Sequence, residues 1–213
     1  MPMNFFNIHT HNPIHPETEI LSLTPDRLPL PKNTIYASIG IHPWYLTEEN
    51  ADTQWNNLLE NVTHNKVIAI GECGLDKLKG PSLTLQTNLF RKEAELAEER
   101  SLPLIIHCVK AFNELIQLKK EIRPHQPWVI HGFRGKESLT TECIRHGFHL
   151  SFGSHFQDKA LKTVPLDRLL IETDEGKQSI ESIYQTISKI RNIPLENLKE
   201  CINKNVREVF FRQ

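Results

Sequence analysis

The stretch Asn7-Ile8-His9-Thr10-His11 closes the first apolar run of the chain and indicates how the rest is organised. Side chains at positions i and i+2 of an extended segment point to the same side, so His9 and His11 can grip one metal ion. A single His-x-His pair is a weak signal. The signal becomes stronger because the same pattern recurs along the chain: several short apolar runs end in an acid or a histidine.

Eight short apolar runs predict eight β-strands. Parallel strands that are buried on both faces read as continuous apolar runs rather than as alternating ones. We expect strands over residues 4–9, 19–23, 35–41, 67–72, 104–107, 128–131, 148–152 and 169–173. The alternation of strands and helical periods indicates parallel βαβ units, and eight strands within this chain length favour a closed TIM-type (β/α) barrel over an open doubly wound sheet.

Helical periods follow most of these strands, and Thr47 and Ser82 are plausible N-caps of two of the helices. The first connection differs, because it has only about ten residues, includes Pro13 and Pro16 and shows no helical period. A parallel crossover normally needs a dozen or more residues and usually contains a helix. We therefore expect the helix between strands 1 and 2 to be missing. If this exposes apolar strands, a second copy would cover them, so monomer and dimer both stay open.

The composition is that of an ordinary globular protein, with 38% apolar and 24% charged residues, and it predicts a single domain over residues 1–213. The chain shows no signal peptide and no apolar run near the roughly 20 residues that span a bilayer, so we expect a cytoplasmic protein without a membrane partner. The net charge of -1 and the lack of an aromatic and basic platform in the sequence argue against a pure nucleic-acid-binding module.

The ends of the expected strands carry side chains that bind metals. They are His9 and His11 on the first strand, Glu72 on the fourth, His107 on the fifth, His131 on the sixth and Asp174 after the eighth. In a barrel these ends lie on one face. Any one of them alone is more often a hydrogen-bonded polar residue or a helix cap than a metal ligand. Six such residues at the same end of the strands indicate two divalent metal ions and a hydrolytic reaction.

Further residues near these strand ends predict an anionic substrate. His42 ends the third strand in Gly40-Ile41-His42-Pro43-Trp44 and is expected to contact substrate rather than metal. Four basic residues follow the ligands closely, namely Lys77, Lys110, Arg134 and Lys177. Positive charge in the first turn of a helix opposes the helix dipole, so several bases at this face favour a phosphate-bearing substrate.

With these motifs the sequence resembles the TatD-type metal-dependent hydrolases, a branch of the amidohydrolase-like barrels. The matching stretches are Asn7-Ile8-His9-Thr10-His11, Gly40-Ile41-His42-Pro43, Gly71-Glu72-Cys73-Gly74-Leu75-Asp76, Leu104-Ile105-Ile106-His107, His131-Gly132-Phe133-Arg134-Gly135 and Glu172-Thr173-Asp174. They occur in the family's order. The resemblance implies a deoxyribonuclease with 3' to 5' exonuclease activity on DNA, and some members act on RNA or aminoacyl-tRNA.

The resemblance also implies a role for each ligand. His9 and His11 would bind one metal with Asp174, Glu72 would bridge, and His107 and His131 would bind the second. Asp174 and Glu72 are the expected catalytic residues, with Asp174 orienting or deprotonating the attacking water. The ions are two divalent cations, with zinc, magnesium, manganese and nickel as the alternatives.

The sequence departs from the family pattern in three ways. Asn7 stands where the family usually has Asp, which weakens the expected support of the metal pair. Glu175-Gly176-Lys177 replaces the usual small residue, Pro and Tyr, so a wall of the substrate pocket differs. The chain is also shorter than typical members, in line with the missing helix.

Two other functions stay open. The metals could serve hydrolysis of a small phosphoester, or of an ester or amide such as aminoacyl-tRNA. The amide alternative is weaker, because barrel amidohydrolases that bridge their metals through a carboxylated lysine need Lys where Glu72 stands. The third possibility is a metal-binding scaffold without catalysis, its pocket rebuilt around residues 175–177.

Overall fold

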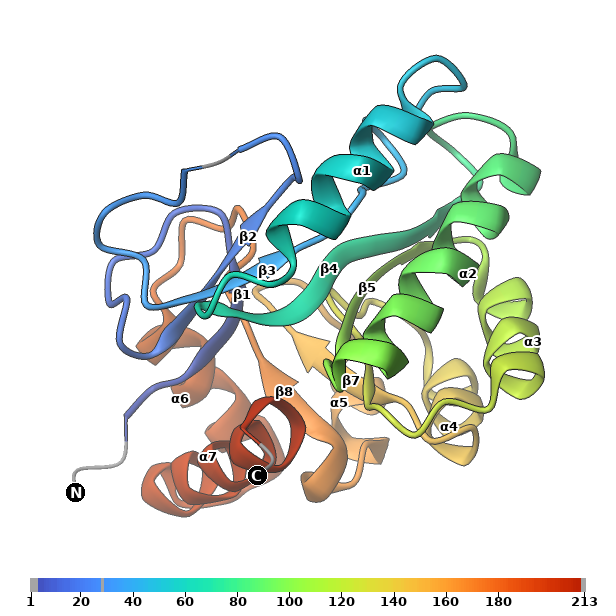
Figure 1. Ribbon diagram of the computed structural model, residues 1–213. Helices are drawn as coiled ribbons and strands as arrows, with labels where there is room; N and C mark the ends of the chain where they lie inside the picture. The colour runs from blue at the N-terminus through green and yellow to red at the C-terminus, as the bar shows by residue number, and fades with distance from the viewer. Residues whose placement is uncertain (1–3, 28, 212–213) are drawn as a thin grey trace. The chain divides into compact units, whose positions relative to one another are not determined.

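The structure, a computed structural model, describes residues 4–27 and 29–211, and its strands and helices alternate along most of that length (Figure 1). The strands are β1 (Asn7–Thr10), β2 (Glu19–Leu23), β3 (Tyr36–Ile39), β4 (Val67–Asp76), β5 (Leu104–Val109), β6 (Trp128–Ile130), β7 (His149–Phe152) and β8 (Leu169–Ile171). The helices are α1 (Ala51–Asn61), α2 (Leu83–Arg100), α3 (Phe112–Ile122), α4 (Glu137–Arg145), α5 (Asp158–Thr163), the short 3-10 helix η1 (Leu166–Arg168), α6 (Ile180–Arg191) and α7 (Leu195–Phe210).

Hydrogen-bonded strand neighbours follow the sequence order from β1 to β8. The pairings of β3 with β4, β4 with β5, β6 with β7 and β7 with β8 are parallel. A further parallel bridge joins Thr10 at the end of β1 to Asp174, which follows β8. This is the strand order of a (β/α) barrel, and the predicted fold class is confirmed. No helix in the described part of the chain is long and apolar enough to cross a membrane.

The chain divides into two compact units. The terminal unit combines the segment that ends at Ile20 with the segment from Val129 onward, and the central unit runs from Leu21 to Trp128. Both divisions fall inside strands, the first within β2 and the second at the start of β6. The expectation of one domain over residues 1–213 stays a prediction.

The central unit is built on β3, β4 and β5, with α2 packed along β4 (Figure 1). Its core includes the fully buried rings of Phe90 and Trp128, which meet edge to face with their centroids 5.2 Å apart. Ser82 caps α2 as predicted, because its hydroxyl accepts a hydrogen bond from the backbone N–H of Leu85. The prediction for α1 was wrong: its N-cap is Asn50, and the Thr47 hydroxyl instead accepts the N–H of Asn50 in the preceding turn.

The terminal unit holds β1, β7 and β8 and the helices α4 to α7. Tyr184 on α6 is completely buried, and its hydroxyl donates to the carbonyl of Phe6 at 2.8 Å and accepts from the N–H of Phe6 at 3.1 Å. This pair of hydrogen bonds fixes the entry to β1. On α7, Asn205 donates to the carbonyls of Leu166 and Leu169, which fixes the entry to β8. Helix α6 therefore anchors β1, which carries His9, and helix α7 anchors β8, which precedes Asp174.

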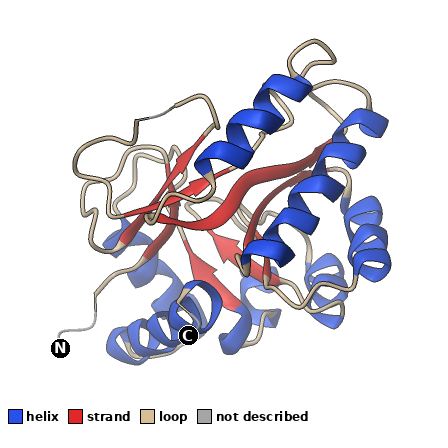
Figure 2. Cartoon of the chain, viewed as in Figure 1, coloured by secondary structure: helices blue, strands red, loops and turns tan. Residues whose placement is uncertain are grey.

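The connection from β1 to β2 has no helix, as predicted, and is a loop over residues 11–18 (Figure 2).

The predicted ends of several strands were wrong. β4 continues to Asp76 and β5 to Val109, so Glu72 and His107 lie inside their strands rather than at the last position. The pairing register shifts between Ile70 and Cys73 and then resumes. The polar residues that end the apolar run therefore do not end the strand. β1, β3, β6, β7 and β8 are shorter or displaced relative to the predicted ranges.

Candidate metal and substrate site

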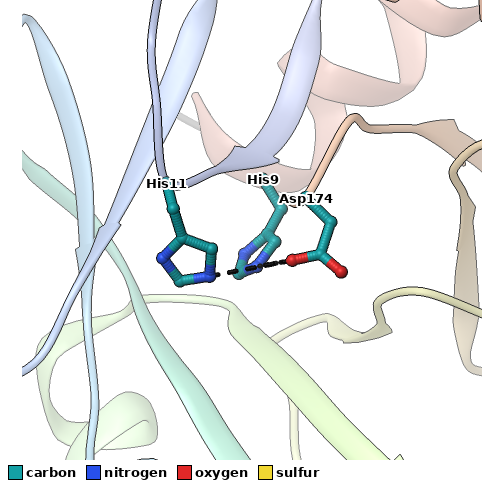
Figure 3. Close-up of side chains that lie close together, drawn as sticks. All are labelled: His9, His11 and Asp174. Carbon is teal, nitrogen blue, oxygen red and sulfur yellow. Dashed lines mark ion pairs between the residues drawn. The ribbon is translucent and has the colours of Figure 1, made fainter. Parts of the chain in front are cut away.

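Three ligand-type side chains meet at the end of β1 in the terminal unit (Figure 3). His9 is fully buried, whereas the side chains of His11 and Asp174 are about a third exposed. The Nε2 atoms of His9 and His11 lie 3.6 and 3.7 Å from the Oδ1 atom of Asp174. The backbone holds this arrangement, because the N–H of Asp174 donates to the carbonyl of His9 at 3.0 Å.

The two distances fit a shared cation better than a hydrogen bond. Nitrogen-to-oxygen hydrogen bonds in proteins are roughly 2.7–3.2 Å long. Two ligand atoms at about 2.1 Å from a tetrahedral ion lie roughly 3.4 Å from each other. Imidazole nitrogen with carboxylate oxygen is a donor set for zinc, nickel or manganese. The residues present at the end of β1 therefore fit a divalent metal ion.

Asn7 positions the segment that carries Asp174. Its Oδ1 accepts the N–H of Thr173 at 3.0 Å, and its Nδ2 donates to the Thr173 hydroxyl at 2.8 Å and to Oε1 of Glu19 at 3.2 Å. An aspartate at this position would offer no N–H and would face the Glu19 carboxylate. The asparagine therefore supplies the hydrogen-bond donor that Glu19 needs. It also links β1 directly to Thr173, the residue before Asp174.

A second ligand group in the terminal unit combines His131, Glu172 and Asp174. Glu172 is fully buried, and its Oε1 accepts the N–H of Gly132 at 2.7 Å and lies 3.3 Å from Nδ1 of His131. Its Oε2 is buried without a hydrogen-bond partner in the described structure, as a carboxylate oxygen reserved for a cation would be. We did not predict Glu172 as a ligand. The spacing i, i+2 from Glu172 to Asp174 is the same signal that singled out His9 and His11.

The central unit holds its own group, formed by His42, Glu72 and His107. Oε1 of Glu72 lies 2.9 Å from Nε2 of His42 and 2.9 Å from Nδ1 of His107. Nδ1 of His42 accepts the N–H of Trp44 at 3.0 Å, so in the neutral ring the proton is on Nε2 and points at Glu72. A protonated nitrogen has no lone pair for a metal. His42 is therefore suited to donating a hydrogen bond rather than to ligating the ion.

Asp76 fixes the other side of the His107 ring. Its Oδ2 lies 3.0 Å from Nε2 of His107 and accepts the indole N–H of Trp44 at 2.6 Å, while Oδ1 accepts the N–H groups of Leu78 and Lys79. Burial raises the pKa of Asp76, but these hydrogen bonds outweigh it and the pKa lies below the ordinary value. Asp76 is therefore a carboxylate at neutral pH and holds the His107 ring in one orientation.

Comparison with known proteins identifies the family of this chain. The profile of the family described as TatD related DNase matches residues 27–211. The chain belongs to this family. The uncharacterized metal-dependent hydrolase YabD of Bacillus subtilis (strain 168) is 33% identical over 202 residues, which cover 83% of this chain and 77% of that protein. The 3'-5' ssDNA/RNA exonuclease TatD of Pantoea ananatis is 31% identical over 203 residues, covering 82% and 77%.

Solved structures of TatD homologs have the same fold as this chain. The crystal structure of the TatD homolog YjjV from Escherichia coli K12 superposes with a TM-score of 0.79 at 21% identity and covers 92% of this chain and 86% of that one. This TatD-family chain is thus a metal-dependent hydrolase with the barrel fold of its relatives.

The four basic residues expected to bind substrate have different surroundings. Lys77 is paired with Glu114 at 2.6 Å, and this hydrogen bond holds the pKa of Glu114 below its ordinary value. Lys110 is exposed just before α3, and Lys177 is exposed in the loop before α6. Arg134 is exposed at the rim of a cleft in the terminal unit. Arg134 and Asp174 line this cleft together, so the positive charge of Arg134 can meet an anion there.

The cleft shows what the departure from the family pattern changes. It has a volume of about 210 Å³ and is lined by Arg134, Ser154, His155, Glu172, Asp174 and Glu175, among others. Glu175 thus contributes a wall of the cleft, whereas Lys177 lies outside its lining. A carboxylate at this wall puts a negative charge in the same cleft as Arg134.

Glu93, on the face of α2 toward the sheet, is a buried carboxyl group. Its Oε1 accepts the backbone N–H of Ile41 at 2.8 Å. Burial raises the pKa of Glu93 well above its ordinary value, although the Ile41 hydrogen bond acts in the opposite direction. As the pH rises above roughly 4.3, the unfolded chain loses this proton while the folded protein keeps it. Stability from this group is therefore complete at low pH and declines as the pH rises toward the pKa of the folded protein.

We expect Glu93→Gln to flatten this pH dependence, because glutamine keeps the acceptor for Ile41 and removes the titration. The quantity to compare is the unfolding free energy of the variant minus that of the parent. This difference should be more favourable to the variant near pH 8 than near pH 5, by about 1–3 kcal/mol. Urea unfolding at both pH values measures it. Glu95→Gln, at an exposed position of the same helix, is the control. Equal differences at the two pH values would contradict this account.

Proposed function

We propose that this TatD-family protein hydrolyses phosphodiester bonds of single-stranded nucleic acid from the 3' end, with two divalent cations as cofactors. The observation that carries the proposal is the geometry of His9, His11 and Asp174, whose nitrogen-to-oxygen distances of 3.6 and 3.7 Å fit a shared ion. The separate group of Glu72 and His107 in the central unit supports a second ion. The name of the Pantoea ananatis relative, a 3'-5' ssDNA/RNA exonuclease, supports the substrate class.

Each residue has a defined task in this proposal. Divalent ions, when bound, neutralise phosphate charge and make a water molecule more acidic. Asp174 orients the attacking water and accepts its proton. Arg134 meets the phosphate at the cleft. The assignment from the family resemblance, with His9, His11 and Asp174 on one ion, Glu72 bridging, and His107 and His131 on the other, stays a prediction.

Three further residues orient or position the proposed metal ligands. Glu172 orients His131, Asp76 orients His107, and Asn7 positions the segment before Asp174. Such partners fix the ring orientation of a ligating histidine and raise its basicity. These contacts support metal binding, and the hydrolysis assay separates an enzyme from a metal-binding scaffold.

The test is digestion of a 5'-labelled single-stranded DNA oligonucleotide with manganese or magnesium. We expect shortening from the 3' end, lost on chelation and lowered by at least about 100-fold in Glu72→Gln, because the amide cannot carry the charge of the carboxylate. Glu60→Gln on the exposed face of α1 is the matched control and should behave as the parent.

Two results would overturn the proposal. Faster turnover of small phosphoesters or of aminoacyl-tRNA than of oligonucleotides would move the protein to another substrate class. Bound metal without hydrolysis of any of these substrates would make it a scaffold. Activity that survives equally in Glu72→Gln would indicate a contaminating nuclease.

A further inference from the structure

Beside the ligand group of the central unit lie aromatic side chains that face solvent. Trp44 is 39% exposed and Tyr45 is 57% exposed. Both lie within three residues of His42 in the stretch His42-Pro43-Trp44-Tyr45. The ammonium group of Lys79 lies over one face of the Trp44 ring, 3.7 Å from the ring centre. We call Trp44, Tyr45 and Lys79 the aromatic platform. Two consecutive exposed aromatic side chains beside a polar site are a candidate ligand-binding surface.

The Trp44 ring is held rigidly. Its indole N–H donates to Oδ2 of Asp76 at 2.6 Å, and the same oxygen lies 3.0 Å from Nε2 of His107. The rings of Trp44 and His107 are 5.4 Å apart and nearly perpendicular, at 77°. One carboxylate therefore fixes both the proposed metal ligand and the exposed indole. A ring that is already fixed loses little conformational entropy when a ligand stacks on it.

Tyr45 is anchored in a different way. Its ring lies 5.4 Å from that of His42, and its backbone carbonyl accepts hydrogen bonds from the side chains of Asn50 and Gln54 at 2.9 and 2.8 Å. Two consecutive aromatic residues are thus each placed against a histidine of the site.

The chemistry of the platform selects the ligand. Base stacking on aromatic side chains, with basic residues for the backbone, is how proteins bind single-stranded nucleic acid. Lys79 supplies positive charge at the Trp44 ring, and its backbone N–H is held by Oδ1 of Asp76 at 3.1 Å. A small phosphoester without a planar group would gain nothing from these rings.

We propose that Trp44, with the Lys79 ammonium over one face of its ring, stacks against a nucleobase through the exposed part of the ring, next to the phosphodiester that is cleaved, and so determines specificity for nucleic acid over other phosphodiesters. This rests on the proposed nuclease function. Hydrolysis by this protein then depends on the base as well as on the phosphate, without reading its sequence, because every base offers a face for stacking.

The test compares a short oligothymidylate with an oligomer of the same length that consists of abasic residues. For the parent, we expect kcat/KM to be higher for the oligothymidylate. In Trp44→Leu it should fall about 5- to 150-fold for the oligothymidylate and less than about twofold for the abasic oligomer, the fold-change that corresponds to a stacking contribution of roughly 1–3 kcal/mol.

Two further variants separate stacking from structural support. Trp44→Phe keeps an aromatic face but lacks the indole N–H to Asp76, so it should retain most of the preference for the oligothymidylate. Trp55→Leu removes another tryptophan of the same unit, which has Lys92 at 5.5 Å from its ring, and should leave both substrates unaffected. Equal losses on both substrates in Trp44→Leu would show that Trp44 only supports Asp76, and would overturn the proposal.

A measurement without catalysis keeps the proposal distinct from the nuclease function. Fluorescence anisotropy of the labelled oligomers, with a chelator present, reports binding alone. Tighter binding of the oligothymidylate than of the abasic oligomer, lost in Trp44→Leu, would support the platform even if the parent hydrolysed neither. Equal binding of the two oligomers by the parent would overturn the platform even if the protein proved to be a nuclease.

Discussion

Replacing Asp174 with asparagine is expected to lower kcat for oligonucleotide hydrolysis by about 10²–10⁴-fold, the range for loss of a general base. The Oδ1 atom of Asp174 faces Nε2 of both His9 and His11 at 3.6 and 3.7 Å. Asparagine preserves the size of the side chain but carries no negative charge and accepts no proton. Because Asp174 is proposed both to bind the ion and to accept the proton, the loss should lie at the upper end of that range. Single-turnover hydrolysis of the labelled oligonucleotide measures it.

The control for this prediction is Glu175→Gln, which neutralises the next carboxylate along the chain. Glu175 lines the same cleft but is absent from the ligand groups of the described residues. It should change the apparent KM more than kcat. If Asp174→Asn stayed within about tenfold of the parent, Asp174 would not be the proton acceptor.

Replacing His107 with alanine is expected to remove hydrolysis to a similar degree. The ring lies between two carboxylates, 2.9 Å from Oε1 of Glu72 and 3.0 Å from Oδ2 of Asp76. Removing the ring removes a proposed ligand and also the contact that Glu72 and Asp76 each make with His107. We expect kcat to fall by at least about 100-fold, and the unfolding free energy by roughly 1–3 kcal/mol, the usual effect of losing a buried hydrogen-bond partner.

His125→Ala is the matched control, because it also removes a histidine that contacts a glutamate of the central unit. The His125 side chain is 93% exposed, and its Nδ1 lies 3.2 Å from Oε2 of Glu98. An exposed pair contributes little to stability, so this variant should behave as the parent. Full activity in His107→Ala would rule His107 out of the reaction.

The fold could be predicted because its signals are local. Buried parallel strands appear as apolar runs, and the short first connection with its two prolines has no room for a helix. The extent of β4 could not be predicted in this way. Its apolar run ends at Glu72, yet the strand continues to Asp76, whose buried carboxylate is satisfied by Trp44 and His107 from other parts of the chain.

The proximity of three candidate site residues could also be predicted, whereas their role as ligands stays a prediction. Residue type and position in the strand were enough to select His9, His11 and Asp174, which the structure brings together. Contacts between distant residues were not predictable. The aromatic platform depends on Lys79 reaching Trp44, and the sequence alone showed no such platform.

Elemental analysis of the purified parent beside His107→Ala tests the two-ion site most directly. We expect about two divalent ions per chain in the parent and about one in the variant, because His107 is proposed to ligate only one of them. Hydrolysis of the oligonucleotide should fall with the loss of that ion. One ion or none in the metal-loaded parent, or two retained in His107→Ala, would contradict the account.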